Sequence, residues 1–224
     1  MTKVVFPFIL ILLLLACNKT DRTISKNLQR DSIIAETKSD LTNNDKVEKE
    51  RIKNFLTIIQ TDSIDQKPIA YYLNNPNLNI LCKKLYNGEF KVIDNNETFD
   101  VLKVISQKND TLYPFYFHCL SSICKVSDGA LSEAMGEHCF EMVYNYPVYC
   151  FKKFAQQPKL MDSYCSFIGF ELSFQTDNTS TITTSYAELK KHLCKKLNLN
   201  DFQVKTTYES FIKAIEVEFE NLKN

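Results

Sequence analysis

The chain has 224 residues and a formal net charge of zero, with 27 basic and 27 acidic residues. Its hydrophobic fraction of 44% and charged fraction of 24% are typical of a globular protein, and they exclude a wholly disordered or fibrous chain. A neutral chain without a basic block is not expected to bind nucleic acid, and only four glycines are present from which a phosphate-binding loop could be built.

The N-terminus carries a short apolar segment. Lys3 supplies a positive charge, and an apolar run interrupted only by Pro7 covers residues 4–15. As a helix this run would rise about 18 Å, well short of the roughly 30 Å hydrocarbon core of a bilayer. A secretory signal sequence is therefore expected here, and a membrane-spanning helix is not.

The apolar run ends in Leu14-Leu15-Ala16-Cys17. This segment resembles the Leu-x-Ala/Gly-Cys box of bacterial lipoprotein signal peptides. In that family the chain is cut before the cysteine, whose sulfur then carries diacylglycerol and whose new amino group is acylated, for example with palmitate. The resemblance implies a signal peptide at 1–16, lipid on Cys17, and a membrane-anchored protein of the cell envelope, because two or three acyl chains anchor stably. The alternative is an ordinary signal peptide with a chance cysteine.

Asn18 follows the cysteine, in place of the aspartate that resembles an inner-membrane retention mark. This favours the outer membrane and leaves the periplasmic and surface faces both open. Residues 17–45 are predicted to form the lipidated N-terminus and a flexible tether, because 18–50 lack aromatic residues and carry balanced charge. A short helix near 33–41 is the alternative. The globular domain is expected at 46–224.

Apolar residues recur with the helical period through most of this domain, which predicts a mainly α fold. Asn75-Pro76 is predicted to begin a helix that Asn87-Gly88 ends. Residues 112–126 are apolar nearly all round, as in a central buried helix. Ser127-Asp128-Gly129 then predicts a tight reversal, with Asp128 as a cap and 130–145 antiparallel to the central helix. Pro147 is expected to begin a shorter helix that turns Val148, Phe151 and Phe154 inward.

The C-terminal part is predicted to be helical too. Between 160 and 184 a helix is favoured, with a short β-hairpin near 167–184 as the alternative. Ser185-x-x-Glu188 and Thr206-x-x-Glu209 resemble capping boxes and are expected to begin the last two helices. The predicted fold class is all-α, either an irregular helical bundle or stacked helical pairs.

Tyr113-Pro114-Phe115-Tyr116 recurs as Tyr146-Pro147-Val148-Tyr149, 33 residues later. Two copies are fewer than a helical repeat array needs. The recurrence reflects either a true repeat or the common placement of proline in a first helical turn.

Two cysteines and two histidines are weak candidates for a disulfide or a metal site. In an antiparallel hairpin about Gly129, Cys119 lies level with Cys139, and His118 lies nearly level with His138. Neighbouring helical residues point about 100° apart, so plain packing is favoured over either site. The row Glu133, Glu137, Glu141 is interpreted as a solvated face, with a carboxylate or calcium site, or contact with a basic partner, as alternatives. His192 is also expected to be solvated.

Motifs for zinc proteases, serine hydrolases, P-loops and dinucleotide binding are absent from the sequence. No catalytic residue, metal or cofactor is therefore predicted, and an enzyme is not the favoured interpretation. The favoured function is binding of another protein by a lipid-anchored helical domain, with a toxin-neutralising immunity protein as one version by architectural analogy. The alternative is an envelope enzyme with a cryptic site at His118, Cys119, His138 and Cys139.

Overall fold

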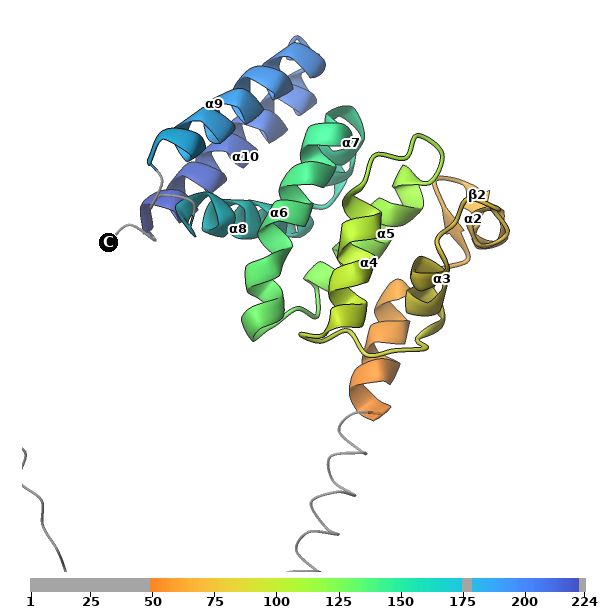
Figure 1. Ribbon diagram of the computed structural model, residues 1–224. Coiled ribbons are helices and arrows are strands. Elements are labelled where there is room, and N and C mark those ends of the chain that lie inside the picture. Colours follow the sequence, from red (N-terminus) through yellow and green to blue (C-terminus); the bar gives the residue numbers. More distant parts are fainter. Residues whose placement is uncertain (1–48, 175–178, 222–224) are drawn as a thin grey trace, which may run out of the picture. The chain divides into compact units, whose positions relative to one another are not determined.

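The computed structural model describes residues 49–174 and 179–221, which lie in the second of two units, Val47–Asn224 (Figure 1). The predicted signal peptide, the lipid site at Cys17 and the tether lie outside the described residues. Within them the fold is mainly α, as predicted, with one two-stranded antiparallel sheet.

The described part begins with a helix at 49–59, on which Phe55 and Ile59 are buried as the helical period predicts. A hairpin not foreseen in the sequence follows, with strands β1 (Ser63–Ile64) and β2 (Lys67–Pro68). Its turn residues Asp65 and Gln66 have φ of 51° and 65°, the paired positive values of a type I′ turn. This turn was not predicted from the sequence because neither Asp65 nor Gln66 is the glycine that usually occurs in such a turn.

Two short helices come next, α2 (Ile69–Leu73) and α3 (Ile80–Asn87). The prediction that Asn75-Pro76 begins the helix is wrong. Asn75 instead accepts a hydrogen bond from the N–H of Asn77 (2.9 Å) in a local turn, and the side chain of Asn79 caps α3 by accepting from the N–H of Leu81 (2.8 Å). Gly88, at φ 69°, ends α3 as predicted.

The centre of the domain is formed by α4 (Asn96–Ser106), α5 (Tyr113–Cys124) and α6 (Gly129–Asn145). The predicted burial of α5 is confirmed along nearly its whole length. Asp128 occupies the cap position of α6, but its side chain makes no capping hydrogen bond and lies 3.7 Å from Arg51. α6 contacts α5 but packs most extensively on α8, so the predicted hairpin with α5 is not the main packing of α6.

Four helices complete the domain: α7 (Pro147–Gln156), α8 (Pro158–Phe174), α9 (Thr179–Lys196) and α10 (Phe202–Asn221). The alternative β-hairpin near 167–184 is wrong, because 167–174 and 179–184 are helical and the buried Tyr164, Ile168 and Leu172 follow the helical period.

Both predicted C-terminal capping boxes lie inside helices that begin earlier. Ser185 falls within α9, and Thr206 within α10. Asp201 caps α10 instead, since its carboxylate accepts from the N–H groups of Gln203 and Val204 at 2.9 and 3.1 Å.

Two glycines let α8 lie close against both α6 and α10 (Figure 1). A Cβ added to Gly136 of α6 would lie 2.7 Å from the carbonyl oxygen of Phe167, a backbone atom of α8. A Cβ on Gly169 of α8 would lie 2.6 Å from the Cβ of Glu218 on α10. These helix pairs make the most extensive contacts in the domain, and they depend on the missing side chains.

A cluster of aromatic rings joins the same helices to α5 and α7. Phe154 stacks on Phe211 (5.8 Å between centroids) and meets Tyr164 edge to face (5.1 Å). Phe117 of α5 stacks on Tyr164 at 5.7 Å. These rings are nearly completely buried, so they supply much of the apolar surface removed from water.

Gly136→Ala is predicted to lower the free energy of unfolding by about 1–3 kcal/mol, because the new methyl group must push α6 away from the α8 backbone. Helix propensity alone would give the opposite sign, since alanine favours helix over glycine. Urea denaturation of the two proteins measures the difference. Glu133→Ala, on the exposed face of α6, is the control and should change stability little. A stabilised Gly136→Ala protein would contradict the close packing.

Candidate functional site

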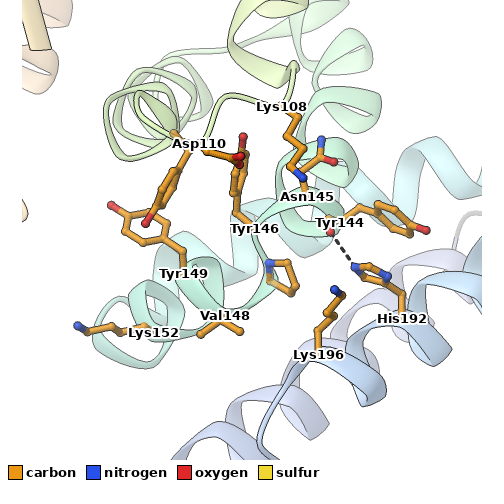
Figure 2. Close-up of a pocket in the computed structure, with 12 residues that line it drawn as sticks. Lys108, Asp110, Tyr144, Asn145, Tyr146, Val148, Tyr149, Lys152, His192 and Lys196 are labelled. Atoms are coloured by element: carbon orange, nitrogen blue, oxygen red, sulfur yellow. Dashed lines mark hydrogen bonds between the residues drawn. The ribbon is translucent and has the colours of Figure 1, made fainter.

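A hollow of about 610 Å³ lies where the end of α6 meets the start of α7, beside the loop before α5 and the last turns of α9 (Figure 2). Four tyrosines, three lysines and one histidine give it its chemical character. We call this surface the tyrosine groove; its defining residues are Tyr113, Tyr144, Tyr146, Tyr149, Lys108, Lys152, Lys196 and His192.

Tyrosines from both copies of the recurring Tyr-Pro-x-Tyr segment line the groove, Tyr113 from the first copy and Tyr146 and Tyr149 from the second. Tyr113 and Tyr146 stack, with centroids 4.7 Å apart and planes 15° apart. Tyr149 meets Tyr113 edge to face at 4.9 Å and 86°. Pro114 and Pro147 stand in the first turns of α5 and α7, so the recurrence marks two helix beginnings that meet in space.

The hydroxyl of Tyr146 is held by the loop before α5. The backbone N–H of Asn109 donates to the Tyr146 oxygen. Burial raises the pKa of Tyr146, and the neighbouring Asp110 carboxylate raises it further. The ring therefore keeps its proton at neutral pH and can donate one hydrogen bond to a ligand.

The opposite wall is formed by α9. His192 Nε2 lies 2.9 Å from the carbonyl oxygen of Tyr144, which can only accept, so Nε2 carries the proton (Figure 2). The two rings stack at 4.0 Å and 15°. His192 is partly exposed, as expected, but its ring is held against Tyr144 and does not stand free in solvent. No local pattern indicates its partner Tyr144, which lies 48 residues away in the chain.

A second hollow of about 590 Å³ adjoins the first and shares Tyr113, Tyr149 and Lys152 with it. Its outer edge is the β1–β2 turn, where Asp65 pairs with Lys153 of α7. Burial raises the pKa of Tyr149 far above its usual value, and a hydrogen bond with Asp65 adds to this effect. The two hollows together give the groove an extended form.

The four residues singled out in the sequence as a disulfide or metal site do not come together. Cys139 meets Cys124, with their sulfur atoms 3.7 Å apart, and the predicted pairing with Cys119 is wrong. Cys119 is fully buried, and the nearby Cys82 adds to the effect of burial in raising the pKa of its thiol. The prediction assumed equal rise on both sides of Gly129, whereas α6 packs mainly on α8, and Cys139 meets the last residue of α5.

The two histidines also have separate partners. His118 Nε2 lies 2.6 Å from the carbonyl oxygen of Ile59, and His138 Nδ1 lies 3.0 Å from Ser106 Oγ. The Ser106 hydroxyl donates to the carbonyl of Leu102 (2.9 Å), so His138 Nδ1–H is the donor in its own bond. Within residues 49–174 and 179–221, no three His, Cys, Asp or Glu side chains are grouped closely enough to hold a metal ion.

These buried thiols are poorly suited to nucleophilic chemistry. Burial raises the pKa of Cys119 and Cys139 well above the usual value, so both stay protonated at neutral pH. Nothing in this geometry supports the alternative of a cryptic Cys/His enzyme. The acidic row Glu133, Glu137 and Glu141 is exposed on α6, as predicted.

Burial, with a smaller effect of Lys103, lowers the pKa of His138 to about 4. In the unfolded chain the imidazole of His138 takes up a proton near pH 6.5, whereas in the folded protein it does so only near pH 4. The contribution of His138 to stability is therefore full above pH 6.5 and is lost as the pH falls from 6.5 toward 4. The loss from this group should be about 3–4 kcal/mol, at roughly 1.4 kcal/mol per pKa unit. Urea denaturation at several pH values measures it. His138→Gln should show a shallower acid dependence than the natural protein, and equal slopes would contradict the assignment.

No helix among the described residues is long and apolar enough to cross a membrane. Comparisons with protein-family profiles, with curated proteins and with solved structures find no match to this chain.

Proposed function

We propose that this chain is a lipid-anchored protein of the bacterial cell envelope whose helical domain binds another protein through the tyrosine groove. The anchor is inferred from the apolar run and the Leu14-Leu15-Ala16-Cys17 box, and Asn18 favours the outer membrane. An immunity protein that neutralises a secreted toxin by binding it is one form of this proposal.

The observation that carries the binding role is an apolar residue left uncovered in a concave surface. Val148 was expected to face the core with Phe151 and Phe154, yet it is 63% exposed and lines the groove. Tyr144, which lines the same hollow, is 39% exposed. Tyrosine is enriched among the residues that contribute most to binding at protein interfaces, and the centre of such interfaces is more apolar than the rest of the surface.

The composition of the groove argues for binding over catalysis. Its described lining contains no cysteine, serine or threonine that could act as a nucleophile. His192, the histidine that lines it, has its Nε2 proton committed to a backbone carbonyl and its ring stacked on Tyr144. These contacts make His192 part of the wall and leave it poorly placed to move a proton.

Cys17→Ala is predicted to abolish partitioning of the protein into a detergent phase and to leave the precursor uncut by the lipoprotein peptidase, because the lipid would have no sulfur to attach to. Phase partitioning and mass spectrometry of the expressed protein measure both effects. Cys194→Ala, which removes the exposed cysteine of α9, is the matched control and should change neither. A mature, membrane-partitioning Cys17→Ala protein would refute the anchor.

A photo-crosslinking residue in place of Val148 is predicted to capture a discrete partner protein in the intact envelope. The matched control is the same residue in place of Val217, which is 48% exposed on α10 and lies outside the groove. Gel electrophoresis and mass spectrometry identify the adduct. Identical adducts at both positions, or none at Val148, would contradict binding through the groove.

A further inference from the structure

The charged groups lining the tyrosine groove are mostly lysines. Lys108, Lys152 and Lys196 line the first hollow, and Asp110 is the one carboxylate beside them among its described lining residues. In the second hollow Lys153 and Asp65 pair with each other, so their charges offset. Three ammonium groups against one unpaired carboxylate leave the groove positive, although the whole chain is neutral.

The three lysines do not converge on one point. Lys108 comes from the loop before α5, Lys152 from α7 and Lys196 from the end of α9, and Figure 2 shows them on separate sides of the hollow. A single phosphate or carboxylate could not contact all of them. A ligand with several anionic groups spaced along its length could.

The tyrosine rings indicate which chemical groups of the ligand lie between its anionic groups. Tyr113 and Tyr146 each cover one face of the other, and His192 covers a face of Tyr144. The rings therefore offer edges and hydroxyls more than open faces, which suits aliphatic side chains and peptide groups better than the flat face of a sugar. The exposed Val148 adds an apolar contact.

We propose that the tyrosine groove binds a segment of a partner protein in which acidic residues alternate with apolar ones. This inference rests on the proposed function and specifies the chemistry of its ligand. The acidic side chains reach the three lysines, while the apolar ones lie against Val148 and the tyrosine edges. The shared residues of the two hollows let the segment continue past Tyr149 toward the β1–β2 turn.

The test uses the full-length protein in detergent and a short fluorescent peptide that alternates glutamate with leucine. A peptide with glutamine in place of glutamate is the comparison. The acidic peptide should bind about tenfold more tightly, since each exposed ion pair contributes a modest factor. The difference should shrink as salt is added, because exposed charges are screened. Equal affinities for the two peptides, or no binding of either, would overturn the proposal.

Two sets of variants locate the site. Replacing Lys108, Lys152 and Lys196 together by glutamine should weaken binding about tenfold. The matched control replaces three exposed lysines that do not line the groove, Lys83, Lys159 and Lys213, and should leave affinity unchanged. Asp110→Asn should strengthen binding about twofold, a gain that a merely structural role of Asp110 would not produce. Circular dichroism shows whether each variant is folded. Equal losses in both lysine sets would overturn the assignment of the site.

Other polyanions are tested in parallel with phosphatidylglycerol vesicles and polygalacturonate. Binding of either through the same three lysines, with no preference for the acidic peptide, would overturn the proposal in favour of a lipid surface or an acidic polysaccharide. If the acidic peptide does not bind while the crosslinker at position 148 still captures a partner protein, the groove binds a protein but not through an acidic segment. If the peptide binds and Val148 captures nothing, the groove is acid-selective but protein binding in the envelope fails.

Discussion

The domain depends on the close approach of three helices, α6, α8 and α10, which Gly136 and Gly169 make possible. Only a residue without a side chain fits at Gly136, because the neighbouring atoms include a backbone carbonyl of α8. The sequence has just four glycines, and two of them serve this purpose. The aromatic cluster of Phe117, Phe154 and Tyr164 then fills the space between α5, α7 and α8.

The groove is a consequence of this packing. α7 lies against α10 and α8 through Phe151 and Phe154, and Val148 stands on the face of its first turn that these contacts leave uncovered. The end of α6 brings Tyr144 against His192 on one side, and the start of α5 brings Tyr113 against Tyr146 on the other. The walls therefore come from four elements, of which α5, α6 and α7 are consecutive while α9 lies farther along the chain. A partner that binds there contacts a surface whose shape is fixed by the core beneath it.

Periodicity predicted which residues are buried better than it predicted where helices begin. Phe55 and Ile59, or Leu189 and Leu193, are buried as expected because one-sided burial imposes the helical period on the sequence. The helix beginnings were missed where several capping residues compete, as Asn75 does with Asn79, since each can satisfy a free N–H locally. The Tyr-Pro-x-Tyr echo was visible in the sequence. That its copies meet, and that Cys139 meets Cys124, depends on crossing angles between helices, which no local pattern encodes.

The domain holds seven cysteines among its described residues, and only Cys194 is exposed. If the chain is exported as proposed, it crosses the inner membrane unfolded and enters an oxidising compartment with every thiol accessible. Once the helices pack, six of those thiols are sealed from disulfide donors by burial. Folding and oxidation are therefore in competition, and the outcome is decided by which is faster. Local helix formation is fast, on the order of a microsecond, and this speed favours folding over oxidation of the core thiols.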